Sequence, residues 1–204
     1  MDPYRLPMFP LGTPLVPGSL LPLQIFEPRY LSMVKACMKA NEGFGVVLAD
    51  PSASLNDPVE VRQGKSSYQI ARYGTLCSIV DFDLGKNGYL QITIQGDAKF
   101  HIDALSIADD GLLISEVSMI AAEVSAPVPK GKQHLVELLQ ALAQHATIQT
   151  LGLELDLINA DQVSGRLVEL LPHCSEFKQE MLELSDPQQR LEEIEAQLLR
   201  LQHE

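Results

Sequence analysis

A charge-free, proline-rich segment near the N-terminus restricts the fold more than any other part of this 204-residue chain. Leu6 to Phe26 contains no charged residue, and its length could span a membrane or serve as the apolar part of a signal peptide. Its five prolines exclude both, because each removes a backbone donor and no continuous helix can form. The segment must be extended and buried in protein. We predict strands at Phe9 to Leu11 and Leu20 to Phe26, with Pro17-Gly18 as the turn between them.

The hydrophobic period changes from extended to helical at Glu27. Pro28 suits the first helical position, and Glu27 places negative charge at the helix N-terminus. We expect this helix to end near Asn41 or Gly43.

The sequence between residues 44 and 120 predicts further strands and one exposed, mobile loop at 50–67. The predicted strands are 44–49, 68–71, 75–82, 89–95, 99–107 and 112–120. Asn87-Gly88 indicates a type I′ hairpin turn, and alternation along 99–107 places Phe100, Ile102 and Ala104 inward. Several short strands with one helix indicate a small closed or nearly closed barrel.

Beyond Pro127 to Pro129 the hydrophobic period is helical throughout. The first apolar stripe is Leu135, Leu138, Leu139, Leu142 and Ala146, and further helices are predicted to start near residues 160, 175 and 187. The last helix carries a seam of Leu191, Ile194, Leu198 and Leu201, which we expect to pack within the chain. We therefore predict a β-rich part at 1–125 and a helical part at 126–204.

Short motifs along almost the whole chain resemble one family. They are F-P-L at 9–11, P-G at 17–18, L-P-L-Q-I-F-E-P-R-Y-L at 21–31, F-G-V-V-L at 44–48, Y-G-T at 73–75, Q-G-x-x-K-F-x-I at 95–102, R-L-x-E-L-L-P at 166–172 and K-x-x-x-L-E-L-x-D-P-x-x-R-L at 178–191. Their order and spacing are similar to the N-terminal domain of Lon protease (ATP-dependent protease La), also called the Lon substrate-binding domain. The form is closest to short, free-standing members of that family.

The resemblance implies an α+β fold, with a PUA-like β-barrel carrying one inserted helix, followed by a C-terminal α-helical bundle. It also implies a non-enzymatic module that binds polypeptide segments or client proteins for proteolysis or quality control. The ATPase and peptidase modules of full-length Lon proteases have no counterpart in the motifs of this chain.

The charge of the chain restricts its partners. Residues 1–125 hold nine Lys+Arg against fourteen Asp+Glu, and residues 126–204 hold six against thirteen, so neither half offers a basic face. We therefore expect no binding to nucleic acid or to an anionic membrane. The three cysteines are far apart in sequence and have apolar neighbours, which predicts buried thiols and a cytoplasmic location.

Catalytic and metal-binding patterns do not emerge from the sequence. Gly64-Lys65-Ser66 imitates the end of a phosphate-binding loop, but Val59 stands where that motif requires its first glycine. His134 and His145, predicted on one helix face, lack a third ligand, whereas catalytic zinc uses three protein ligands. We therefore assign no catalytic residue, no cofactor and no metal.

The start of the predicted helix is the candidate binding site. Its members are Phe26, Glu27, Arg29, Tyr30 and Met33, which we expect to line a groove for extended polypeptide, with the 50–67 loop as a flap. A structural role is the competing interpretation, in which Glu27 serves the helix N-terminus, Arg29 pairs with a carboxylate and Tyr30 fills the joint between barrel and helix.

Two other function classes stay open at this point. The PUA-like resemblance offers RNA binding, against which the charge argues, and the protease name offers a cryptic hydrolase, for which no nucleophile and base are visible. For the oligomeric state we expect a monomer or a weak homodimer.

Overall fold

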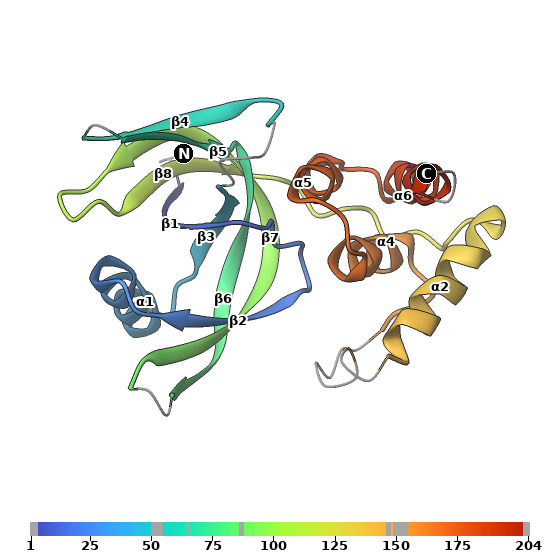
Figure 1. The fold of residues 1–204 in the computed structure, drawn as a ribbon, viewed down its shortest axis with the longest axis horizontal. Coiled ribbons are helices and arrows are strands. Elements are labelled where there is room, and N and C mark those ends of the chain that lie inside the picture. Colours follow the sequence, from blue (N-terminus) through green and yellow to red (C-terminus); the bar gives the residue numbers. More distant parts are fainter. Residues whose placement is uncertain are drawn as a thin grey trace. The chain divides into compact units, whose positions relative to one another are not determined.

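The computed structural model describes residues 4–49, 55–64, 66–85, 88–145, 148 and 155–201, and the fold is mixed α+β, as predicted. The chain divides into two units, each described separately (Figure 1). The first comprises Met1–Ala121 and Ser175–Leu182, and the second comprises Ala122–Cys174 and Glu183–Glu204.

A six-stranded sheet that closes on itself forms the centre of the first unit (Figure 1). Its strands are β1 (Tyr4–Leu11), β2 (Leu20–Ile25), β3 (Phe44–Leu48), β6 (Tyr73–Leu84), β7 (Leu90–Ile107) and β8 (Leu113–Met119). They lie in the order β2-β7-β6-β3-β1-β8, and β7 also pairs with β8. The length of β7 makes this closure possible, because its first part pairs with β2 and its last part, from Phe100, pairs with β8.

Two clusters of buried apolar side chains stabilise this unit. In the first cluster, Tyr30, Met33 and Val34 of α1 (Pro28–Ala40) pack with strand residues such as Ile92. In the second, Phe100 and the inner residues of β1 and β8 pack against the hairpin of β4 (Pro58–Gln63) and β5 (Ser66–Ala71). Each fully buried aliphatic or aromatic side chain contributes about 1.5–3 kcal/mol.

The helix α1 begins and ends where the sequence predicts. Pro28 occupies the first helical position, where its missing N–H has no intrahelical partner to lose. Asn41 has φ 55°, and its N–H closes the last turn on the carbonyl groups of Cys37 and Met38. Asparagine tolerates this left-handed conformation better than most residues, so α1 stops there.

Two strand predictions differ from the structure. The segment 50–67 predicted as a loop contains β4 and the first two residues of β5, which pairs with β4 in a hairpin and continues through the strand predicted at 68–71. Residues 50–54 and 65 of the segment lie outside the described residues. The two strands predicted at 89–95 and 99–107 are one strand, β7. Ala104 is exposed because the register shifts between Ile102 and Ala104, which reverses the alternation there.

The turn between β6 and β7 confirms a hairpin but differs in register from the predicted turn. The N–H of Gly88 donates to Gly85 O, which makes Gly88 the last residue of the turn instead of a central one. Its φ of +80° suits glycine. Asn87 lies outside the described residues, as does Ala146 of the predicted helical stripe.

The second unit is helical in its described part. Its elements are the 3-10 turn η1 (Lys130–Lys132) and the helices α2 (Gln133–Ala143), α4 (Ala160–Leu170) and α6 (Pro187–Leu201). Val163 and Leu167 of α4 are fully buried, as are Leu191 and Ile194 of α6, whereas Leu201 at the end of the predicted seam is exposed.

The helix α5 (Ser175–Glu183), expected in the helical part, belongs to the first unit over residues 175–182. The Lys99 ammonium group is buried and donates to Leu182 O at 3.1 Å, and Gln179 Nε2 donates to Tyr73 O at 3.2 Å. Periodicity along α5 predicts the helix but carries no information about which unit it packs on. The division at residues 125 and 126 stays a prediction.

Candidate functional site

Arg29 contacts two other residues of the predicted site, Glu27 and Tyr30, at the start of α1. We call the region of Phe26, Glu27, Arg29, Tyr30 and Met33 the corner. The Arg29 guanidinium lies 2.8 Å from a carboxylate oxygen of Glu27 and donates to Gly111 O at 2.9 Å. It also lies over the Tyr30 ring, 4.7 Å from the centroid. The structural roles weighed for Arg29 are therefore present in the structure, although the Glu27 side chain makes no capping hydrogen bond to α1.

Of the five residues of the predicted site, Phe26 and the Glu27–Arg29 ion pair are accessible to a ligand. Tyr30 and Met33 are 8% and 3% exposed and pack in the core, where the Tyr30 and Phe9 rings lie 4.3 Å apart. Burial raises the pKa of the Tyr30 hydroxyl to about 12. The expectation that Tyr30 and Met33 line an exposed groove is wrong for this conformation, because the apolar face of α1 that carries them is turned to the core. A binding role for the corner stays a prediction.

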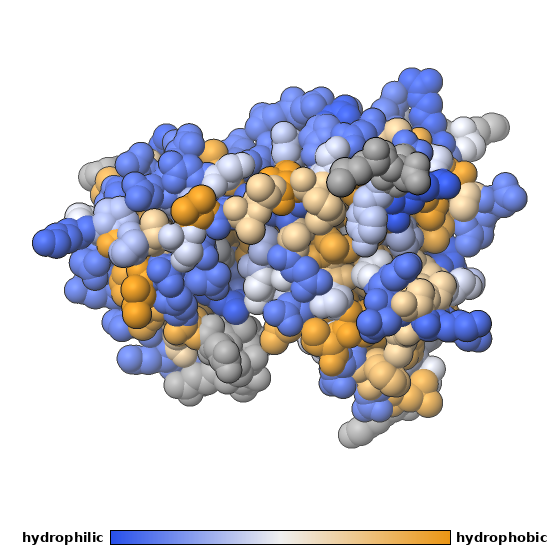
Figure 2. Space-filling view, turned by 180° about the vertical axis from the view of Figure 1, so that it is seen from behind, coloured by the Kyte–Doolittle hydropathy of each residue, from blue (hydrophilic) through white to orange (hydrophobic). Residues whose placement is uncertain are grey.

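A larger apolar surface lies at the far end of β6. Phe82 is 60% exposed and Leu84 is 70% exposed, and Val80 beside them is also exposed. Figure 2 shows hydrophobic surface gathered at the lower right, where the end of the β6–β7 hairpin projects. Exposed apolar side chains that cluster in this way are typical of interaction sites.

One cleft, of about 430 Å³, lies between this end of β6 and the C-terminal end of α1. Its apolar lining includes Met38 of α1 and Ile79, Val80 and Phe82 of β6. Its polar lining includes Glu42 and Asp97. We call it the inner cleft, because Phe82 pairs with Ile92, whose side chain lies in the core on the same face of the sheet.

Partial burial raises the pKa of the Asp97 carboxyl, although the hydroxyl and N–H of Ser78 oppose that rise. A negative charge at Asp97 is therefore less well solvated than at a fully exposed position. A cationic group in the inner cleft would compensate for the lost solvation.

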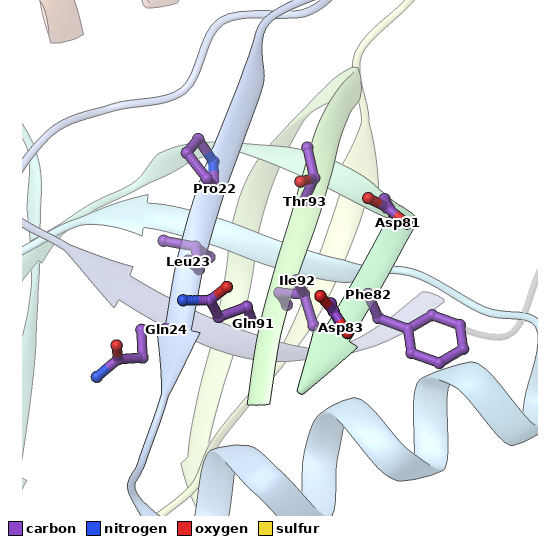
Figure 3. Close-up of a pocket in the computed structure, with 9 residues that line it drawn as sticks. All are labelled: Pro22, Leu23, Gln24, Asp81, Phe82, Asp83, Gln91, Ile92 and Thr93. Atoms are coloured by element: carbon purple, nitrogen blue, oxygen red, sulfur yellow. The ribbon is translucent and has the colours of Figure 1, made fainter. Parts of the chain in front are cut away.

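A second cleft, of about 440 Å³, lies on the opposite face of the same strands (Figure 3). It is lined by Pro22, Leu23, Gln24, Asp81, Phe82, Asp83, Gln91, Ile92 and Thr93. Figure 3 shows the Phe82 ring extending beyond the edge of β6, away from β7. We call this the outer cleft. Phe82 therefore lines both clefts.

None of the residues predicted as a binding site belongs to this surface, although the sequence contains a signal for it. Residues 80–84 read V-D-F-D-L, an alternation of apolar and acidic residues that ordinarily indicates a strand with one buried face. In the structure the apolar face of this segment is exposed, because β6 extends past the core that it covers. Sequence pattern alone does not show where a strand leaves its core.

Other candidate chemistry is not assembled in the described part of the chain. No group of three His, Cys, Asp or Glu residues could hold a metal ion there, and no described helix is long and apolar enough to cross a membrane. Gly64 lies in the tight turn between β4 and β5, so the Gly-Lys-Ser tripeptide does not open a helix. Cys37 and Cys77 are buried, as predicted, but Cys174 is exposed because it lies between α4 and α5.

Comparisons with known proteins agree with the motifs. The sequence matches the model of the ATP-dependent protease La (LON) substrate-binding domain over residues 5–200. Among solved structures, it is similar to a Lon N-terminal domain protein from Xanthomonas campestris, with 30% identity, a TM-score of 0.75, and coverage of 95% of this chain and 98% of that chain. The N-terminal domain of Mycobacterium avium complex Lon protease shares the fold at 15% identity and a TM-score of 0.58, with 94% and 96% covered. No curated protein matches the sequence.

Proposed function

We propose that this chain, which belongs to the ATP-dependent protease La (LON) substrate-binding domain family, is a non-enzymatic module that binds polypeptide segments of client proteins. The observation that carries the proposal is the exposed apolar surface at the end of β6, with a cleft on each face of the strand. Binding of unfolded or extended polypeptide requires such a surface, with apolar groups to bury and polar groups at its rim.

Two details of the architecture, the type of barrel and the helical bundle, are also proposed from the family match. We propose that the closed sheet of the first unit is a PUA-like barrel and that the helices of the second unit form the C-terminal bundle of the family. The support is the match of the family model over both units, together with the sheet closure by β7. We also propose a cytoplasmic location, for which the free cysteines are the support.

RNA binding is the weaker alternative. Both clefts have carboxylates in their linings and, among the described residues, neither lining includes Lys or Arg. Phosphate groups would be repelled there, since nucleic-acid affinity depends on cationic side chains that neutralise phosphates. A hydrolase is the other alternative. In the inner cleft the Ser78 hydroxyl donates to the Asp97 carboxylate at 3.2 Å, but in the described part of the chain neither cleft lining includes a histidine or lysine that could serve as the base of a catalytic triad or dyad.

The proposal is tested by probing a peptide array with the purified full chain, and by assaying RNA binding and the hydrolysis of ATP and casein with the same preparation. We expect a subset of peptides to bind, with no salt-dependent RNA binding and no turnover. Absence of binding to any peptide, or turnover that survives further purification, would overturn the proposal.

Two matched variants locate the surface. Phe82→Ser removes an exposed ring, and we expect binding of the selected peptides to weaken by about tenfold or more, as for an aromatic residue at the centre of an interface. Ile158→Ser is the control, because Ile158 is 71% exposed in the second unit and should leave binding unchanged. Phe26→Ser, at 61% exposure, tests the predicted corner by the same measurement.

A further inference from the structure

The end of β6 has a free edge in the described part of the chain. On one side β6 pairs with β7 as far as Leu84, but on the other side its pairing with β3 ends at Cys77, opposite Phe44. At Gly43 the backbone passes so close to the carbonyl oxygen of Cys77 that a Cβ there would clash with it, so only glycine fits at this point. Before Gly43 the chain belongs to the end of α1. The place beside residues 78–84 where the line of β3 would continue holds no described strand.

Backbone groups of β6 point toward this free edge. The N–H of Gly85 donates to Tyr89 O at 2.9 Å, which makes this pair the first hydrogen-bonded rung of the hairpin. In an antiparallel ladder such rungs alternate, so Asp83 and Asp81 also bond toward β7. The N–H and C=O of Phe82 therefore point toward the free edge, together with the C=O of Leu84. The N–H of Leu84 is already bonded to the Asp83 carboxylate at 2.7 Å.

The inner cleft lies where one set of side chains of an added strand would go, whereas the outer cleft lies over β2, β7 and β6 and only its residues Asp81 and Asp83 would neighbour that strand. Successive side chains of a strand point to opposite faces, and neighbouring strands lie about 4.7–4.9 Å apart. One set of side chains would therefore enter the apolar inner cleft beside Phe82 and Met38. The other set would lie on the outer face beside Asp81 and Asp83, at the distance of cross-strand pairs.

The acidic side chains of the clefts favour a basic peptide segment over an acidic one. Glu42 and Asp97 line the inner cleft and Asp81 and Asp83 line the outer cleft, without Lys or Arg among these lining residues. Carboxylates directly opposite an acidic segment would repel it, whereas Lys or Arg side chains would pair with them.

We propose that the free edge of β6 binds an extended polypeptide by strand addition, and that the preferred segment alternates apolar residues, held in the inner cleft, with Lys or Arg residues, held beside Asp81 and Asp83. This inference rests on the proposed function and specifies its binding mode and substrate class. Main-chain hydrogen bonds to Phe82 and Leu84 supply a part of the affinity that is independent of side chains.

The direct test uses a peptide that alternates valine and lysine, and two versions of it in which N-methyl groups block alternate amides. One version blocks the amides on one edge of the extended peptide, and the other version blocks the opposite edge. Only one edge can face β6, so we expect one version to bind about tenfold or more weakly and the other to bind like the parent peptide. Fluorescence anisotropy of labelled peptides with the full chain measures this difference.

Charge variants test the role of the Asp81 and Asp83 carboxylates. Asp81→Asn with Asp83→Asn should weaken the lysine peptide by about three- to tenfold at low salt and should remove its preference over the same peptide with glutamate in place of lysine. Asp109→Asn with Asp110→Asn is the matched control, since it removes the same charge from two adjacent exposed acids, one of which also accepts a backbone N–H. The control should bind like the wild type.

The outcomes separate the two proposals. Equal binding of both N-methylated versions would overturn strand addition, while peptide binding itself would still support the proposed function. Equal effects of the two charge-variant pairs would overturn the role of Asp81 and Asp83. If no peptide of any sequence binds, the proposed function fails together with the inference.

Discussion

Replacing Glu123 by leucine would leave the Arg190 guanidinium buried without its carboxylate. In the second unit Arg190 Nη1 donates to Glu123 Oε2 at 2.9 Å, and Nη2 bonds the other carboxylate oxygen. The same guanidinium donates to Ser164 Oγ at 3.1 Å and to Leu184 O at 2.7 Å, and its side chain is only 6% exposed. These two neutral acceptors do not compensate a full positive charge.

The expected cost follows from that burial. Removing one partner of a buried ion pair costs about 3–5 kcal/mol, because the remaining buried charge loses the carboxylate that balanced it. Glu123→Leu should therefore lower the free energy of unfolding of the second unit by about that amount. The double variant Glu123→Leu with Arg190→Leu should cost less than the sum of the two single variants, because no uncompensated charge remains.

The stabilities of the wild type, the two single variants and the double variant are measured by urea denaturation followed by far-UV circular dichroism. This signal is suitable because the chain has no tryptophan for fluorescence and the second unit is helical in its described part. Glu60→Leu is the matched control, because Glu60 pairs with Arg62 at a similar distance, 2.8 Å, on an exposed surface. We expect that variant to unfold at the wild-type urea concentration. A Glu123→Leu variant as stable as Glu60→Leu, or a double variant that costs the sum of the single ones, would refute the reasoning.

Three further predictions concern stability and accessibility. Gly165→Ala should stabilise α4 by about 1 kcal/mol, because an added Cβ meets no described atom within 4 Å, and an unchanged or lower urea midpoint would contradict this. A thiol reagent should modify Cys174 alone in the native protein and all three cysteines after denaturation, and fast native labelling of a second thiol would show that the core opens. Ile194→Asp with Leu198→Asp should lower the melting temperature at every protein concentration, since Ile194 is fully buried and Leu198 half-buried, and a fully buried aliphatic side chain contributes about 1.5–3 kcal/mol. A wild-type melting temperature with a change from dimer to monomer would instead place α6 at an interface.

Local sequence signals predicted the elements whose limits depend on local chemistry. Pro28 and Asn41 mark the two ends of α1 because each acts through its own backbone conformation. Likewise, the alternation along 99–107 was sufficient to predict that Phe100 and Ile102 point inward, where both are buried. Such signals are contained in a few neighbouring residues, and the structure retains them.

Features that depend on distant pairing could not be predicted in this way. The exposure of Ala104 results from a register shift against β8, and the free edge at Phe82 results from the end of β3 at Phe44. Tyr30 illustrates the same difficulty at the candidate site, since the sequence places it at a helix start but does not show that Phe9 covers it. In each case a partner far away in sequence decides the outcome.

The sharing of the first unit between two chain segments has a consequence for biosynthesis. A ribosome releases the sheet strands well before α5, so the Lys99 ammonium group has to stay hydrated until Leu182 has been synthesised. Domains generally fold as units during synthesis, N-terminal ones first, but here the last eight residues of the first unit arrive after most of the second. We expect nascent chains that end before residue 175 to expose sheet surface that α5 later covers, and to depend on chaperones until α5 has been synthesised.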